Sequence, residues 1–243
     1  MAKRRLDALL VDRGLAESPE KARALVMAGQ VTVDERPAPK PGSLVAEDVS
    51  LAVDLGPRYV SRGGEKLEHA LASFGIDVNG LVAGDIGAST GGFTDCLLQH
   101  GAARVYAVDV GRAQLDYKLR GDPRVVSMES VNARDLASLP EAIDIAVIDV
   151  SFISLRAVLP TVGRLLKPGA PIVALFKPQF EATKEEVPRG GVIRDAQLHS
   201  TLIGRFASWL VTNGFSVRDL VASPILGAEG NREFLFLLKA GAR

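Results

Sequence analysis

The stretch from residue 85 to residue 95, DIGASTGGFTD, decides the fold class of this 243-residue chain. An apolar run ends in Asp85, and glycines at positions 87, 91 and 92 follow before a helical pattern begins. Glycines at such a turn allow close approach of a ligand to the backbone, and the first amides of the helix favour an anionic group. The stretch therefore predicts a strand, a ligand-binding turn and a helix.

The same alternation of strand-like and helical patterns continues to the end of the chain. Apolar, strand-like runs lie at residues 81–87, 103–110, 124–130, 144–152, 171–177, 215–223 and 233–240, and helical patterns lie at 91–101, 113–119, 154–166 and 196–214. This order predicts an α/β fold with a Rossmann-like, mostly parallel sheet that binds ligands at the carboxyl ends of its strands. The connection at 224–232 is too short for a parallel crossover, so one strand should be antiparallel.

The composition favours a folded cytoplasmic protein. Apolar residues make up 47% of the chain, and 29 Lys and Arg balance 29 Asp and Glu, so a nucleic acid would have to bind a local patch. The single cysteine, Cys96, excludes an intramolecular disulfide, and no stretch resembles a signal peptide or membrane span. The three histidines have no Cys or His neighbours at metal-ligand spacing, so we expect no metal. No feature indicates an obligate protein partner.

Residues 1–57 are predicted to form a separate small α+β domain. Two short amphipathic helical patterns, at 4–15 and 18–30, precede strand-like segments at 31–35 and 48–53. Ser18 is placed to cap the second helix. Charged residues on or near the two helices are Arg4, Arg5, Lys21 and Arg23. By charge alone they would indicate a solvated face.

The order of elements in this domain resembles a small RNA-binding module shared by a small-subunit ribosomal protein, pseudouridine synthases and tyrosyl-tRNA synthetase. The resemblance rests on RLD at 5–7, GLA at 14–16 and ARALVMAGQVTV at 22–33. It implies that the four basic residues contact structured RNA by shape and phosphate. A linker rich in Gly and Arg is expected at 58–64, and its Arg62 is a further RNA-binding candidate; residues 65–243 form the large domain.

A second acid, Asp109, follows the next predicted strand, 22 residues after Gly87. This spacing suits a carboxylate that accepts hydrogen bonds from two ribose hydroxyls. A nicotinamide-dependent oxidoreductase could use the same geometry. However, its G-x-G-x-x-G pattern would have a glycine where Ser89 stands, and no Tyr or His is evident as a hydride-relay residue.

Charged residues mark the ends of four distant elements. Asp149 and Lys177 each end a predicted parallel strand, and Pro178 follows the lysine directly. Glu233 begins the antiparallel last strand, and Lys66 begins the helix that leads into the first strand. The topology brings all four to the same edge of the sheet, beside the glycine turn. Taken singly, Lys66 and Glu233 could be surface charges. Asp149 could cap a turn, and Lys177 could lay its apolar stem along the sheet with its charge in solvent.

Taken together, these residues resemble the TlyA family of 2′-O-ribose RNA methyltransferases and its FtsJ-like relatives. SRGGEKL, VIDVSFIS, FKPQFE and GNREF stand where TlyA proteins carry them. The resemblance implies that S-adenosylmethionine is the cofactor and that ribosomal RNA is the partner, with cytidine as the target nucleotide. It also implies a catalytic set of Lys66, Asp149, Lys177 and Glu233. The implied cofactor-binding residues are Asp85, Gly87, Ser89, Gly91, Gly92, Asp109 and Asn132. Relatives also carry the label haemolysin, but nothing here resembles an export signal or membrane span.

The roles within the charged set stay partly open at this stage. We expect Lys177 to act as general base, Asp149 to orient it, and Lys66 with Glu233 to hold the ribose, although these roles could be exchanged. A base must be neutral part of the time: burial and Lys66 favour a neutral Lys177, whereas the two carboxylates favour its charged form. The segment 184–195 is either an RNA-contacting lid or a solvated loop.

Overall fold

The computed structural model describes residues 2–54 and 56–241 and divides into two compact units, Met1–Arg58 and Tyr59–Arg243. Each unit has its own buried apolar core. The first helix of the second unit, α3 (Gly63–Phe74), begins inside the segment 58–64 that the sequence indicated as a linker.

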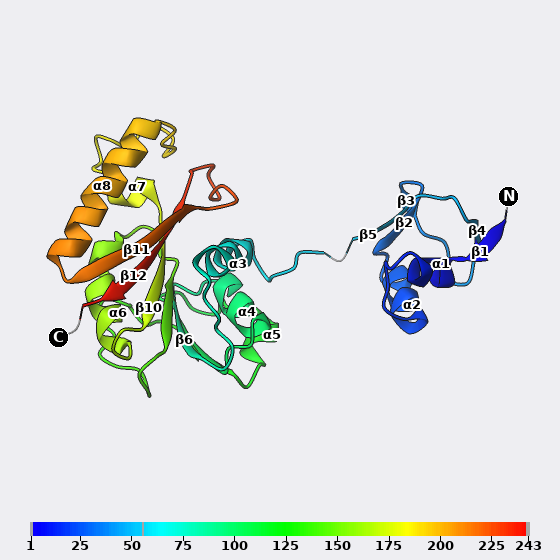
Figure 1. Ribbon diagram of the computed structural model, residues 1–243, viewed down its shortest axis with the longest axis horizontal. Helices are drawn as coiled ribbons and strands as arrows, with labels where there is room; N and C mark the ends of the chain where they lie inside the picture. The colour runs from blue at the N-terminus through cyan, green and yellow to red at the C-terminus, as the bar shows by residue number, and fades with distance from the viewer. Residues whose placement is uncertain (1, 55, 242–243) are drawn as a thin grey trace. The chain divides into compact units, whose positions relative to one another are not determined.

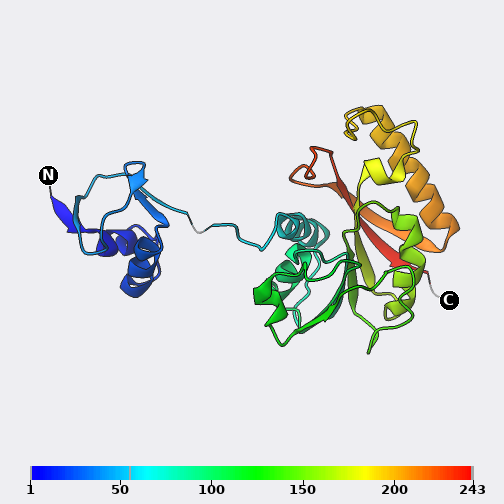
Figure 2. The ribbon, with the colours of Figure 1, turned by 180° about the vertical axis from the view of Figure 1, so that it is seen from behind.

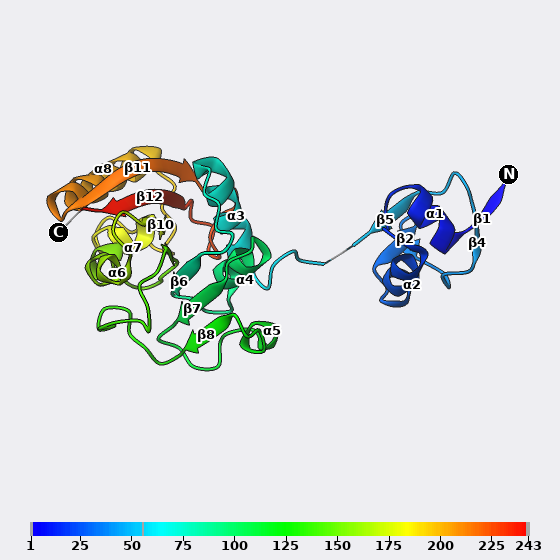
Figure 3. The ribbon, with the colours of Figure 1, turned by 60° about the horizontal axis from the view of Figure 1, so that its bottom comes forward.

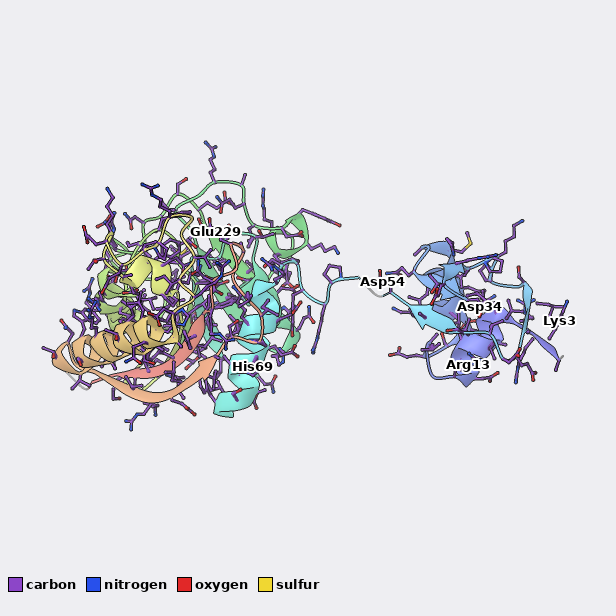
Figure 4. The ribbon with its side chains drawn as sticks, turned by 90° about the horizontal axis from the view of Figure 1, so that it is seen from above. Lys3, Arg13, Asp34, Asp54, His69 and Glu229 are labelled. Atoms are coloured by element: carbon purple, nitrogen blue, oxygen red, sulfur yellow. The ribbon has the colours of Figure 1, made fainter. Side chains whose placement is uncertain are left out.

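The small unit packs two helices on short strands. Helices α1 (Leu6–Asp12) and α2 (Pro19–Met27) bury an apolar face, and the Ser18 hydroxyl accepts a hydrogen bond from the Lys21 amide at 3.2 Å, as the sequence predicted for a cap. Strand β1 (Lys3–Arg5) pairs with β4 (Leu44–Ala46), and β2 (Val31–Val33) lies between β3 (Arg36–Pro37) and β5 (Leu51–Val53). Figure 4 labels Lys3, Arg13 and Asp34 in this unit.

A seven-stranded sheet in the order β11-β12-β10-β9-β6-β7-β8 forms the centre of the large unit (Figure 1). Its strands are β6 (Val82–Ile86), β7 (Arg104–Val108), β8 (Val125–Met128), β9 (Ile145–Ile148), β10 (Pro171–Phe176), β11 (Phe215–Ala222) and β12 (Phe234–Ala240). Strand β12 pairs antiparallel with both neighbours, and the other pairings are parallel. The predicted α/β class and its antiparallel strand are confirmed.

Helices cover both faces of this sheet (Figure 3). On one face lie α3, α4 (Gly92–Gln99) and α5 (Tyr117–Arg120); on the other lie α6 (Leu159–Leu165) and α8 (Ala196–Thr212), with α7 (Pro178–Glu181) beside α8. In β9, Ile145 and Val147 belong to the core under α3 and α4, whereas Ala146 and Ile148 belong to the core under α6 and α8. Burial on both faces explains the unbroken apolar runs of the sequence.

The helix predicted at 113–119 is shorter in the structure. Ala113 has a φ of 55°, a left-handed backbone conformation that an α-helix cannot include, and α5 begins only at Tyr117. The Asp116 side chain caps it by accepting from the Lys118 amide at 2.8 Å.

The direction of β12 brings distant residues to one edge. Phe234 at its start pairs with Phe176 at the end of β10, so Glu233 lies beside the residue that follows β10, Lys177. Figures 1 and 2 show the loop between β11 and β12 beside α3 from opposite sides. None of the helices within residues 2–54 and 56–241 has the length and apolar character needed to span a bilayer.

Candidate active site

A cavity of about 260 Å³ opens at the carboxyl edge of the parallel strands. The four charged residues predicted from the sequence all line it. Its lining residues are Ser61, Arg62, Gly63, Lys66, Gly87, Ala88, Ser89, Thr90, Gly92, Phe93, Asp149, Lys177, Ala228 and Glu233. The structure thus places Lys66, Asp149, Lys177 and Glu233, which come from α3 and from the ends of β9, β10 and β12, around one space.

Lys177 is held by two side chains of the loop after β9. Its ammonium nitrogen lies 2.6 Å from Asp149 Oδ1 and donates to Ser151 Oγ at 2.7 Å. The lysine side chain is 11% exposed, and its Nζ lies 5.9 Å from the centre of the Phe180 ring. Pro178 directly after it begins α7, which ends the strand and turns the lysine toward the loop. Ser151 was not singled out from the sequence because a lone serine carries no signal.

Lys66 and Glu233 form a second, more deeply buried ion pair. Lys66 Nζ lies 2.5 Å from Glu233 Oε2, and the two side chains are 10% and 4% exposed. Close behind, the fully buried Asn231 accepts from the Ile193 amide and donates to the Gly191 carbonyl, both at 2.9 Å. The start of β12 is therefore joined both to α3 and to the segment 184–195.

The glycine turn after β6 forms the floor of the cavity. Gly87 has a φ of 87°, and a Cβ there would lie 2.5 Å from the Asp149 carbonyl oxygen. At Gly92 a Cβ would lie 2.2 Å from Ser61 Oγ. Glycine is required at both positions because larger residues would collide with the neighbouring loop or with the start of α3.

A small hollow adjoins the cavity and shares Ala88 and Ser89 with it. Asp109 lines it, with its carboxylate oriented by the Ser89 amide at 2.7 Å and the Gly111 amide at 2.6 Å. Glu129 also lines it: Oε2 accepts from the Ala113 amide at 2.8 Å, while Oε1 is buried and has no hydrogen-bond partner among the described residues.

The sequence proposed Asn132 for this region and missed Glu129, three residues earlier. Asn132 is not among the residues that line either space, and its Oδ1 accepts from the amide and the Nε of Arg134. Glu129 directly follows β8, as Asp109 follows β7. An acid at the end of the third parallel strand was the signal that could have identified it.

Asp85 lies beneath the turn and is fully buried. Its Oδ2 accepts from the Thr94 hydroxyl at 2.6 Å, and neither cavity includes it among its lining residues. Burial raises the pKa of Asp85 to about 7, and the negative charge of Asp149 adds to this effect. Asp85 therefore lies under the glycine turn and outside both cavities. Its carboxyl group changes charge near neutral pH.

The RNA-binding candidates lie in both units. In the small unit Arg4 pairs with Asp12 at 2.8 Å, Arg5 with Asp7 at 2.7 Å and Arg23 with Glu20 at 2.6 Å, and Lys21 is exposed. Arg5 donates from Nε and a terminal nitrogen to the buried Asp7, so it also fixes the start of α1. Arg62 belongs to the large unit, where it lines the larger cavity.

An exposed aromatic residue beside the charged set was also missed. Phe152 is 89% exposed, has a φ of 62°, and its ring centre lies 5.2 Å from that of Phe180. Phe152 directly follows Ser151 but is not among the residues that line either cavity, and its exposed ring makes it a candidate for contact with a substrate.

The chemistry available here is proton transfer and charge stabilisation. Two lysines and two carboxylates face a cavity whose floor is backbone, and a hydroxyl, Ser151, contacts one lysine. Within the described parts of the chain, no three or more His, Cys, Asp or Glu side chains are grouped so that they could hold a metal ion.

The fold and this site define an FtsJ-like methyltransferase. The family model described as FtsJ-like methyltransferase matches residues 59–240, and the S4 domain model matches residues 4–49. The chain belongs to the FtsJ-like methyltransferases, and the alternative of a nicotinamide-dependent oxidoreductase is set aside.

Within that class, the chain belongs to the TlyA family. It is 46% identical over 246 residues to the 16S/23S rRNA (cytidine-2′-O)-methyltransferase TlyA of Mycobacterium tuberculosis, covering 98% of this chain and 91% of that protein. It is 50% identical over 243 residues to YqxC of Bacillus subtilis, provisionally named an rRNA methyltransferase, covering 97% and 85%. A solved Streptococcus thermophilus structure, provisionally described as a hemolysin, matches with a TM-score of 0.74 and 45% identity, covering 99% and 90%.

Proposed function

We propose that this protein transfers a methyl group from S-adenosylmethionine to the 2′-hydroxyl of a cytidine in ribosomal RNA, in the cytoplasm, and that its S4 domain docks the structured RNA. The observation that carries the proposal is the meeting of Lys66, Asp149, Lys177 and Glu233 around one cavity beside the glycine turn. The relatives named as rRNA (cytidine-2′-O)-methyltransferases support the choice of substrate.

The residues that line the two adjoining spaces suit the two halves of S-adenosylmethionine. In the small hollow, Asp109 is oriented by two amides and Glu129 offers a buried oxygen without a partner, so both can accept from ribose hydroxyls or a base amine. In the larger cavity, Gly87 and Gly92 let the turn pack closely against Asp149 and Ser61, which sets the floor on which a ligand would lie. Bound there, the cofactor supplies a methyl group on a positively charged sulfur that an oxygen nucleophile can attack.

The chain's own residues would activate that oxygen. A ribose 2′-hydroxyl is a weak nucleophile, and Lys177, in its neutral form, would take its proton. Asp149, 2.6 Å from the lysine nitrogen, orients it and stabilises the ammonium that forms. A general base contributes about 10²–10⁴-fold, and positioning contributes about 7–11 kcal/mol.

The other two charged residues would position the ribose. The Lys66–Glu233 pair lines the same cavity and is fixed by its burial, so it presents a rigid polar wall to the sugar. The exposed Phe152 offers a ring on which an unstacked base can lie, as single-stranded RNA bases do on aromatic side chains. Arg62 adds a positive charge to the lining of the larger cavity.

The test replaces the proposed base. Lys177→Ala should lower methyl transfer to rRNA by about 10²–10⁴-fold, measured with radiolabelled S-adenosylmethionine, while the dissociation constant of the cofactor, measured by calorimetry, stays unchanged. Lys167→Ala is the matched control, since Lys167 is an exposed lysine 2.7 Å from Asp144 and outside both cavities. Full activity of the Lys177 variant would remove the proposed base, and loss of cofactor binding would reassign the residue to the cofactor site.

A further inference from the structure

We propose that Glu181 is a positioning residue for methyl transfer: from the end of α7 it fastens the loop 149–155, so that this loop keeps its place when Lys177 loses its proton. The inference rests on the proposed function, because it takes Lys177 as the base. The loop carries Asp149 and Ser151, the two partners of that lysine, and the exposed Phe152.

The contacts of Glu181 are directed entirely at this loop and its continuation. Oε2 accepts from the Ser154 hydroxyl at 2.6 Å, and Oε1 accepts from the Leu155 amide at 2.7 Å. Arg156 Nε lies 3.8 Å from Oε2, and the Glu181 side chain is only 2% exposed. Both carboxylate oxygens are therefore used, and water does not compete for them.

Helix α7 is joined to the loop at both of its ends. Lys177, immediately before the helix, contacts Asp149 and Ser151, and Glu181, its last residue, contacts Ser154 and Leu155. The first link depends on the charge of the lysine, because a neutral amine loses its ionic attraction to Asp149. The second link involves no lysine proton. It persists through the step in which the first link weakens.

The loop needs a second link for a further reason. Phe152 has a φ of 62°, and a non-glycine residue in such a conformation costs roughly 1–3 kcal/mol unless its surroundings hold it. Glu181 accepts hydrogen bonds from Ser154 and Leu155, the second and third residues after Phe152. Without those bonds, the backbone between Asp149 and Leu155 could relax, and Asp149 and Ser151 would leave Lys177.

The charge of Glu181 gives a way to separate positioning from stability. Burial raises the pKa of Glu181, so the folded protein favours its protonated form more than the unfolded chain does. That contribution to stability is complete at acid pH and is lost as the pH rises, so near pH 7.5 the buried charge is a cost to the fold. A glutamine at this position would avoid that cost: its oxygen can accept from the Leu155 amide, and its nitrogen can donate to the Ser154 hydroxyl.

The experiment compares Glu181→Ala, Glu181→Gln and the control Asp219→Ala in the full chain, since Asp219 is exposed on the edge strand β11 and lies outside both cavities. Glu181→Ala should lower kcat by on the order of 10²-fold, the cost of misplacing catalytic groups by about 1 Å, with KM and Kd for S-adenosylmethionine unchanged. Glu181→Gln should recover most of kcat and melt no lower than the wild type near pH 7.5. Asp219→Ala should match the wild type in every measurement.

Two results would overturn the inference: a Glu181→Ala protein with wild-type kcat, or a Glu181→Gln protein that loses as much kcat as the alanine variant. If the alanine variant does not fold, Ser154→Ala decides, since it removes one of the two bonds; a several-fold lower kcat supports the inference and an unchanged kcat refutes it. Failure of the proposed function is distinct. It would appear as a wild-type protein without rRNA methylation, or as an active Lys177→Ala variant.

Discussion

Replacing Glu233 by glutamine tests both the fold and the site, because the Lys66–Glu233 pair is almost closed to water. The side chains are 10% and 4% exposed, and the charged atoms lie 2.5 Å apart. Glu233→Gln leaves the shape of the side chain nearly unchanged but leaves the Lys66 ammonium buried without an ionic partner. Removing one partner of a buried pair destabilises a protein by about 3–5 kcal/mol.

Deprotonation of Lys66 limits how much stability the Glu233→Gln variant can lose. A stranded lysine can become neutral, which costs about 4 kcal/mol near pH 7.5 for an ordinary lysine. The expected loss is therefore about 3–4 kcal/mol, which lowers the melting temperature of a unit of this size by roughly 6–16 °C. The same variant should lose methyl transfer, since it changes the cavity wall that we propose holds the ribose.

The assay is thermal unfolding followed by circular dichroism, together with methyl transfer to rRNA. Glu141→Gln is the matched control: Glu141 lies 2.7 Å from Arg104 and outside both cavities, and the two side chains are 39% and 50% exposed. An exposed pair contributes about 0–1 kcal/mol, so this control should stay close to the wild type in both measurements.

A double variant separates stability from catalysis. Lys66→Met with Glu233→Leu replaces both charges by apolar groups, which restores stability in many buried pairs. We expect its melting temperature to return toward that of the wild type while activity stays lost. A Glu233→Gln protein that melts within about 1 °C of the wild type would refute the burial argument, and an active double variant would refute the role of the pair in holding the ribose.

Three further predictions follow from single features of the structure. With the pKa of Asp85 raised to about 7 by burial, ionisation of this carboxyl costs the fold on the order of 4 kcal/mol, and that stability is lost as the pH rises toward this pKa. Asp85→Asn should therefore melt increasingly above the wild type as the pH rises from 5 to 8, and a difference in melting temperature that does not change with pH would contradict this. Phe152→Ala should weaken kcat/KM for rRNA by about 1–3 kcal/mol while Phe152→Tyr retains most of it, and equal values for the two variants would exclude stacking. Deleting residues 1–57 should spare cofactor affinity in calorimetry and abolish rRNA methylation; undiminished turnover by the fragment would reject the docking role.

The fold could be predicted from the sequence to the extent that periodicity and turn residues determine it. Apolar runs that alternate with helical patterns predicted the seven strands, and the short connection 224–232 predicted the antiparallel direction of β12. The length of α5 could not be predicted, since the positive φ at Ala113 arises from the loop around it and not from its own residue type. The pairing of β1 with β4 was not predicted either, because a three-residue strand shows almost no sequence pattern.

The site was predictable where topology alone brings residues together. Asp149, Lys177 and Glu233 stand at strand ends, and the sheet brings such ends to one edge. Residues that act through a neighbour carried no such signal: Ser151 contacts Lys177 only because the loop after β9 curves toward α7. Glu181 is similar, since a glutamate within KPQFE gives no sign in the sequence that it reaches across to Leu155.

The difference in burial between the two ion pairs bears on which lysine exchanges a proton. Lys66 and Lys177 both line the cavity and are exposed to nearly the same extent, 10% and 11%, so the difference lies in their partners. Lys66 faces a glutamate that is 4% exposed, whereas Lys177 faces an aspartate that is 24% exposed and its other partner, Ser151, lies at the surface. A general base must return its proton to solvent after every turnover, and the more exposed partners of Lys177 give water better access to that site. This contrast favours Lys177 as the base and leaves Lys66 as a fixed charge, an assignment that the order of residues in the sequence left open.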